Sequence, residues 1–245
     1  MEQYFPHEKL AVYGVALRYA AIADELLATW SSSWAVHGQF DRATESVVTN
    51  LAQAAGRRGT EAGLYSIECS LGSVLECAAC MDVASIRGLV DMTGMQLAKE
   101  VLRQIARMEV GLRSSWENSV REEPEPYGTD SERYFLHESL EVYQRSLQVH
   151  RALEAIWQSG QARSRHVKRV DELTTSLTLN IAEGNGRFSK IDHRKFVATA
   201  EEAGTKLAAY LDLLVSSTPA NIERVKSYLR EVMAMLSGLK RYLDE

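Results

Sequence analysis

The sequence predicts an all-α protein made of two tandem up-down-up-down four-helix bundles, and two observations carry this prediction. The first is an internal repeat: residues 4–13 match residues 134–143 at seven of ten positions, and the same offset relates Asn50 to Asn180. The second is the helical spacing of apolar residues along nearly the whole chain, without sustained strand-like alternation. An offset shared by separate segments indicates a duplicated unit, which sets the fold prediction.

Length and composition are consistent with two globular units. The 245 residues allow each copy its own core, and 45% of them are hydrophobic. The formal net charge is −5, of which residues 1–120 carry −4 and residues 121–245 carry −1. This acidic balance argues against a strongly nucleic-acid-binding domain, although the second half holds most of the cations.

Four helices are predicted in the first copy. Pro6 suits the first turn of a helix, and Leu10, Tyr13 and Leu17 begin a stripe that continues through Ala20, Asp24 and Leu27. Thr60 is a predicted N-cap, and Gly56 is a predicted left-handed C-cap of the second helix. The predicted ranges are 6–29, 40–56, 61–83 and 89–113.

The second copy has matching start and stop signals for its helices. Ser189 is a predicted N-cap, Gly184 to Gly186 are predicted left-handed caps, and Thr218 before Pro219 opens the last helix. The predicted ranges are 132–158, 165–184, 190–215 and 219–243, the last with an unbroken stripe from Ile222 to Leu243. Two prolines and four acids within residues 114–128 indicate a linker. The predicted domains are therefore 1–113 and 132–245, joined by a linker at 114–131.

One segment carries a family resemblance. Residues 176–189 form the run SLTLNIAEGNGRFS, and residues 72–76 form GSVLE. Together they resemble the signature of the bacterial four-helix-bundle family of 23S rRNA intervening-sequence proteins, or S23 proteins. The resemblance covers nearly the whole chain as two copies. The first copy departs at the main signature, where Gln53 replaces Glu183 and Ala54 replaces Gly184.

The resemblance implies a bundle fold and only a broad functional class. Members of this family are similar to the accessory variability determinant of diversity-generating retroelements, a pentameric basic bundle that binds nucleic acid and a reverse transcriptase. Other members are encoded inside insertions in ribosomal RNA genes. The resemblance therefore implies a nucleic-acid or protein-binding role without catalysis.

The signature residues have two explanations. Glycines at a helix end have a local structural reason, since they allow a left-handed cap, and an asparagine there can bond to nearby backbone. Alternatively, the segment forms a polar site at one end of the bundle. The structural explanation is favoured. The residues concerned are Asn180, Glu183, Gly184, Gly186 and Arg187.

Cations of the second copy are candidates for phosphate contacts. Arg169 and Arg187 are 18 residues apart on one predicted helix, so about 27 Å separates them. The cations therefore gather at opposite ends of the bundle, and a solvated charged surface is the favoured explanation for them. The candidates are Arg163, Arg165, Lys168, Arg169, Arg187, Lys190, Arg194 and Lys195.

No metal or cofactor site is predicted. The repeated His-Glu pairs at 7–8 and 137–138 lack a second histidine four residues on, and no histidine follows a glutamate at the di-iron spacing. Cys77 and Cys80 form a lone pair without a second pair of ligands, so burial as small apolar residues is favoured over metal binding. Three cysteines and no secretory leader or long apolar run predict a cytoplasmic protein that does not enter a membrane.

The sequence thus favours a non-catalytic module that acts by protein–protein association or self-association. The alternative is an RNA- or DNA-binding accessory protein, with a reverse transcriptase as the partner that the resemblance implies. No catalytic residue is assigned, because no nucleophile elbow, phosphate loop or paired-carboxylate motif occurs.

Overall fold

The computed structural model describes residues 5–118, 135–160, 166–214 and 219–244, and these residues form helices without any strand. The all-α prediction is therefore confirmed for the described part of the chain. The first half contains the 3-10 helix η1 (Pro6–Lys9), α1 (Ala11–Leu27), α2 (Ala35–Gly56), α3 (Glu61–Ile86) and α4 (Met92–Asn118). The second half contains α5 (Leu136–Ser139), α6 (Glu141–Gln158), α7 (Val167–Asn185), α8 (Lys190–Leu213) and α9 (Pro219–Asp244).

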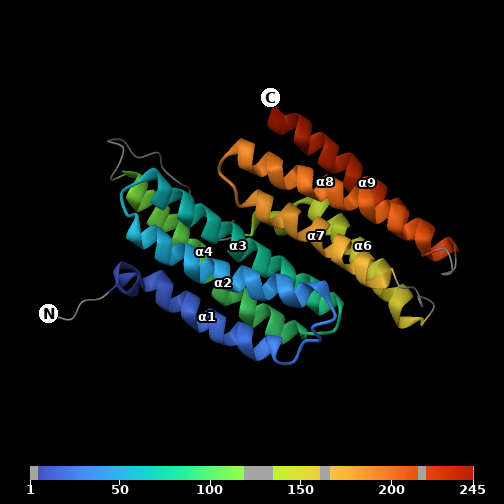
Figure 1. The fold of residues 1–245 in the computed structure, drawn as a ribbon, viewed down its shortest axis with the longest axis horizontal. Helices are drawn as coiled ribbons and strands as arrows, with labels where there is room; N and C mark the ends of the chain where they lie inside the picture. The colour runs from blue at the N-terminus through green and yellow to red at the C-terminus, as the bar shows by residue number, and fades with distance from the viewer. Residues whose placement is uncertain (1–4, 119–134, 161–165, 215–218, 245) are drawn as a thin grey trace.

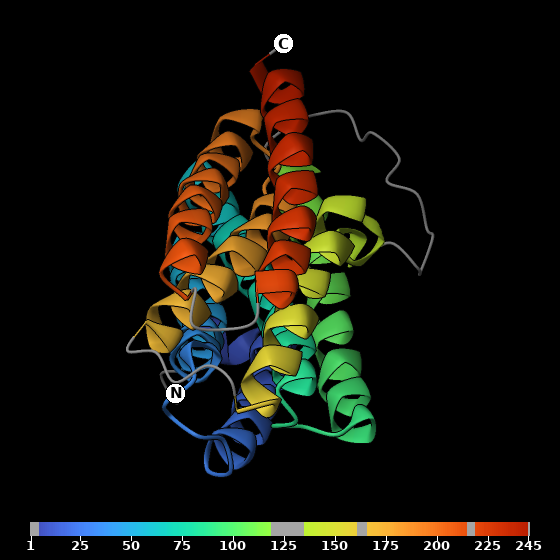
Figure 2. The ribbon, with the colours of Figure 1, turned by 90° about the vertical axis from the view of Figure 1, so that its right-hand side faces the viewer.

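The long helices pack in two groups that share one hydrophobic core. Within the first half, consecutive helices contact each other and α4 returns to α1; α6 to α9 do the same in the second half. Between the halves, α3 packs on α6 and α7, and α2 packs on α7. Figure 1 shows α1 and α9 at opposite outer edges, and Figure 2 shows the same packing after a quarter turn, with α9 in front of the other helices of the second half.

Both repeated blocks contain a break that the sequence analysis did not predict. The predicted helices 6–29 and 132–158 are each interrupted at one leucine, where Leu10 and Leu140 have extended backbone. The short turn before each break folds back so that its histidine ring lies against a tyrosine of the next helix, with centroids 4.6 Å apart for His7–Tyr13 and 4.8 Å for His137–Tyr143. Residues six apart in a continuous helix are about 9 Å apart along its axis and lie on different sides, so this ring contact depends on the break.

Two other predicted boundaries are wrong for reasons of tertiary contact. Helix α2 begins at Ala35 rather than residue 40, because the Asp171 carboxylate of the second half accepts a hydrogen bond from the Ala35 N–H (2.8 Å). Helix α4 runs to Asn118, so residues 114–118 are helix rather than linker. Trp116, 3% exposed, anchors that last turn against Ala54. The remainder of the predicted linker lies outside the described residues.

Helix α1 buries a different face from the predicted one. Val12, Val15, Ala16, Tyr19 and Ala23 form its buried side, whereas the predicted stripe through Leu10, Tyr13 and Leu17 stays partly or largely exposed. The predicted stripe of α9 is confirmed, since Ile222, Val225, Leu229, Val232, Leu236 and Leu243 are all buried.

Helix α3 is the central element. From Ser66 to Ile86 it has no exposed residue, because it faces α2 and α4 on one side and α6 and α7 on the other. It is also the one described helix with the length and apolar composition to cross a membrane, and 72% of its most apolar stretch is buried inside the protein. Burial between two layers of helices accounts for that composition without a bilayer.

A carboxylate is buried inside the first half. Glu109 on α4 is fully buried and accepts a hydrogen bond from the Ser70 hydroxyl of α3 (2.5 Å). Burial raises the pKa of Glu109 to about 8, and the bond from Ser70 opposes this only in part. The native protein therefore keeps this carboxyl protonated at neutral pH.

Glu109→Gln tests this protonation. An unfolded glutamate ionises near its ordinary pKa of 4.5, whereas the native one does so near 8. Over that window this group lowers the free energy of unfolding by about 1.4 kcal/mol per pH unit as pH rises. Urea unfolding at pH 5.5 and pH 8.5 should therefore show that Glu109→Gln becomes the more stable chain relative to wild type as pH rises. A difference between the two proteins that does not change with pH would contradict the buried acid.

Candidate functional site

The two halves are joined at one end by a buried ionic cluster. Arg87, at the end of α3, donates to Glu154 of α6 (2.6 Å) and to Asp171 of α7 (2.5 Å), and its side chain is 0% exposed. Its guanidinium also lies over the Trp34 ring, 4.4 Å from the centroid. Burial raises the pKa of Asp171, although Arg87 and the Ala35 N–H act in the opposite direction. The cluster therefore fixes α2, α3, α6 and α7 to each other.

A second polar contact joins the halves through the repeated block. Lys99 of α4 donates to Asp82 of α3 (2.6 Å) and to Glu138 of α5 (2.8 Å), while the Tyr143 hydroxyl of α6 donates to Asp82 (2.8 Å). The neighbouring His137 is fully buried, and this burial, with a smaller effect of Lys99, lowers its pKa to about 3. His137 is therefore neutral and serves packing.

The family-like signature of α7 lies against the first half. Arg187, whose side chain is 7% exposed, pairs with Glu183 (2.5 Å) and donates to the Cys69 sulfur (3.3 Å). Glu68 of α3 accepts a hydrogen bond from the Phe188 N–H (2.9 Å). Arg187 is thus enclosed by protein groups and is not available on an open surface.

The signature glycines serve close packing, and the predicted left-handed caps are wrong. Among the described residues, positive φ occurs only at Gly59, Gly88 and Gly160. A Cβ on Gly184 would lie 2.9 Å from the Phe196 Cβ, and one on Gly186 would lie 2.8 Å from a Leu75 methyl carbon. Side chains at these positions would separate α7 from α8 and from α3. The Asn180 amide donates to the Ser176 carbonyl (2.7 Å), a local backbone contact.

The remaining candidate cations are spread over two ends of the second half. Arg163 and Arg165 lie outside the described residues. Lys168 and Arg169 are exposed at the start of α7, where Arg169 pairs with Glu172 (2.8 Å). Lys190 lies over the Tyr242 ring, and Arg194 and Lys195 pair with Asp244 and Asp192. The spacing in the sequence predicts that these two groups of cations lie apart, and the described members of the two groups do lie apart.

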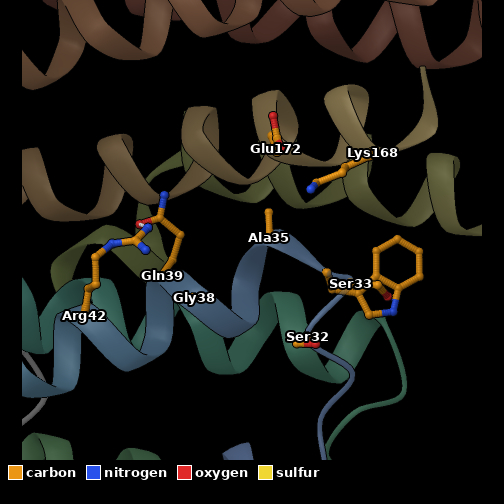
Figure 3. Close-up of a pocket in the computed structure, with 9 residues that line it drawn as sticks. Ser32, Ser33, Ala35, Gly38, Gln39, Arg42, Lys168 and Glu172 are labelled. Atoms are coloured by element: carbon orange, nitrogen blue, oxygen red, sulfur yellow. Dashed lines mark hydrogen bonds between the residues drawn. The ribbon is translucent and has the colours of Figure 1, made fainter. Parts of the chain in front are cut away.

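A polar cleft of about 390 Å³ lies between α2 and α7, and Lys168 is the one predicted candidate that lines it. Figure 3 shows Lys168 and Glu172 from α7 opposite Gln39 and Arg42 from α2, with Ser32 and Ser33 in the loop that precedes α2. Two cations and two hydroxyls could receive an anion, although Glu172 places a negative charge in the same cleft. Arg42 is not a candidate from the sequence, because only the docking of the halves places it in one cleft with Lys168, and Figure 3 shows the two side chains at opposite ends of this cleft.

A second cleft, of about 520 Å³, lies along η1 and the start of α1. It is lined by the repeated block of the first copy, including Glu8, Tyr13 and Leu17, and Leu17 is 48% exposed. The matching residue of the second copy, Leu147, is 3% exposed because α6 packs on α3. The same motif is therefore interior in one copy and surface in the other.

The described residues contain no cluster of side chains suited to bind a metal ion, and two of the cysteines are buried. No group of three or more His, Cys, Asp or Glu side chains lies close enough there to hold a metal ion. Cys77 and Cys80 are buried and reduced, and burial raises the pKa of both thiols. They pack as small apolar residues in α3.

Comparison with protein-family models, curated proteins and solved structures finds no match to this chain. The resemblance to S23 proteins therefore rests on the signature residues alone.

Removal of the Arg87 guanidinium should strongly destabilise the protein. Arg87→Met leaves Asp171 and Glu154 without their buried partner, which typically costs about 3–5 kcal/mol. Arg169→Met breaks an exposed ion pair with Glu172 on α7 and should change the free energy of unfolding by less than about 0.5 kcal/mol. Urea unfolding of the two variants measures the difference. Similar losses for both would contradict a buried ionic joint at Arg87.

Proposed function

We propose that this chain is a non-catalytic binding module of the S23-like four-helix-bundle family that acts by protein–protein association. We further propose that its halves are two tandem bundles that arose by duplication. Adding 130 to the bounds of α1 gives 141–157, which matches α6 (Glu141–Gln158). Adding 130 to α2 and α3 gives 165–186 and 191–216, close to the bounds of α7 and α8. The breaks at Leu10 and Leu140 occur at the same offset.

The observation that carries the proposal is the unequal burial, in the two copies, of the repeated block and of the leucine four residues after it. Phe5 is 67% exposed and Leu17 48%, whereas their counterparts Phe135 and Leu147 are 6% and 3% exposed. The second copy uses this block to bind protein, since Glu138 and Tyr143 contact Lys99 and Asp82 of the first half. The first copy presents the same residue types at a surface cleft, which favours association with another protein surface. Three free cysteines, two of them buried, are consistent with the reducing cytoplasm that we propose as its location.

Amine-specific cross-linking tests the proposal, because the exposed Lys9 lines the cleft. In cells that produce the protein, Lys9 should cross-link to a lysine of another polypeptide chain, whether a second copy or a different protein. Leu17→Glu should reduce this product by at least about tenfold, since it places a charge in an apolar contact. Glu25→Lys, on the same helix but outside the cleft, is the control. Cross-links from Lys9 that stay within one chain would contradict association through this surface.

RNA or DNA binding, with or without a reverse transcriptase as partner, is the second candidate. The observation in its favour is that Arg42 and Lys168, from different halves, line the same cleft. If nucleic acid binds there, Arg42→Ala and Lys168→Ala should each weaken binding and reduce the salt slope by about 1. Lys206→Ala, which removes an exposed cation paired with Glu202 on α8, should change little. A gel-shift assay with structured RNA at low salt measures this, and the absence of a shift would exclude the candidate.

A further inference from the structure

The contact between the halves is one-sided. The second half presents an internal docking face from α5 and α6, and the first half presents an internal acceptor cluster from α3 and α4. If the halves were related by a two-fold axis, α1 would pack on α8 just as α6 packs on α3, but α1 and α8 share no comparable contact in the described parts of the chain. The internal docking face is Phe135, His137, Glu138, Tyr143 and Leu147, and the internal acceptor cluster is Asp82, Lys99 and Arg103.

The first half carries an unoccupied counterpart of the docking face. Its residues, taken at the offset of 130, have identical types and form the head face: Phe5, His7, Glu8, Tyr13 and Leu17. The head face is already folded like its counterpart, since each histidine ring lies against its tyrosine at nearly the same distance. All of its residues except Phe5 line the cleft on η1 and α1, and α1 lies at an outer edge of the molecule (Figure 1).

The second half carries an unoccupied counterpart of the acceptor cluster. Asp212 on α8 corresponds to Asp82 at the offset of 130, and Lys226 and Arg230 on α9 correspond to Lys99 and Arg103 at an offset of 127. Lys226 and Asp212 form an ion pair, as Lys99 and Asp82 do. We call Asp212, Lys226 and Arg230 the tail cluster.

The alignment of α4 with α9 is supported by burial, and the tail cluster is accessible. Ala98, Leu102 and Ile105 correspond to Val225, Leu229 and Val232, and all six are almost completely buried. The Asp212 and Arg230 side chains are 67% and 64% exposed, and the Lys226 side chain is 21% exposed. Arg230 pairs with the exposed Glu223 (2.7 Å). Next to Asp212 in the sequence, Leu213 is 57% exposed, whereas its counterpart Val83 is fully buried. The tail cluster thus has the charges of the acceptor cluster and an apolar neighbour, and in the described part of the chain Asp212 and Arg230 stay largely exposed.

We propose that a second copy of this chain docks head to tail, with the head face of one molecule on the tail cluster of the next. This inference rests on the proposed association function and names its partner. Glu8 accepts from Lys226, as Glu138 accepts from Lys99, and Tyr13 donates to Asp212, as Tyr143 donates to Asp82. One oxygen of Glu8 already accepts from the Phe5 N–H (2.7 Å), and a carboxylate has a second oxygen for the lysine. Such a contact is heterologous, so repeated docking closes a ring or extends a filament.

Charge reversal on the purified full-length protein tests the pairing, with molar mass measured by light scattering across a wide concentration range. Wild type should self-associate as concentration rises. Glu8→Lys and Lys226→Glu should each weaken this by at least about tenfold, because each sets like charges against each other. The double variant, and an equimolar mixture of the two single variants, should regain association because the opposite charges meet again. Glu25→Lys makes the same reversal on α1 outside the cleft and should behave as wild type.

Several results would overturn the inference. A wild-type chain that stays monomeric at every concentration would do so, as would self-association that neither single variant weakens. Failure of the double variant and of the mixture to recover, with circular dichroism showing every chain folded, would exclude the Glu8–Lys226 pairing. If the purified chain is monomeric while Lys9 cross-links to a different protein in cells, the association function stands and only the second copy is excluded as its partner.

Discussion

Enclosure of α3 between two layers of helices is the constraint on which the rest of the structure depends. A helix without a solvent face cannot be stable in a separate bundle, because its second apolar side would then meet water. The second half covers that side with α6 and α7. Polar contacts between the halves lie along the length of α3: Glu68 is near its start, Asp82 is in its last two turns, and Arg87 is at its end. Together they set the position of the second half along α3.

The ionic cluster at Arg87 links local structure to this docking. Trp34 offers α2 no side-chain cap, so the helix receives its N-terminal acceptor from Asp171 of the other half. The same carboxylate receives Arg87, whose charge would otherwise be buried alone at a large cost. One side chain therefore starts a helix, neutralises a cation and joins the halves. We expect the halves to unfold together, because separating them exposes α3 and removes the acceptor from α2.

Much of the fold could be predicted from the sequence, while the contacts between the halves could not. Periodicity located the helices, and local rules identified Thr60 and Ser189 as caps, each of which accepts from a backbone N–H three residues on. Local rules failed where a distant group decides: at Ala35, where Asp171 is the cap, and at Gly186, whose missing Cβ makes room for Leu75. The α1 stripe was misassigned because both sides of that helix carry apolar residues, and periodicity cannot say which side meets the core. Arg187 was a candidate for phosphate contact by charge alone, and only its partners reveal its burial.

One-sided docking also accounts for how the copies differ. The first copy needs an α3 that is apolar on both sides, whereas α8 has only one side to bury. At the offset of 130, Leu75 of α3 corresponds to Thr205 of α8, and Leu75 is buried while Thr205 is exposed. The head face shows the opposite pattern, because Phe5 and Leu17 are apolar like their buried counterparts Phe135 and Leu147, although neither is buried. The apolar residues and the Glu8 charge on the head face, together with the Asp-Lys pair on the tail cluster, are the groups that the proposed head-to-tail contact requires.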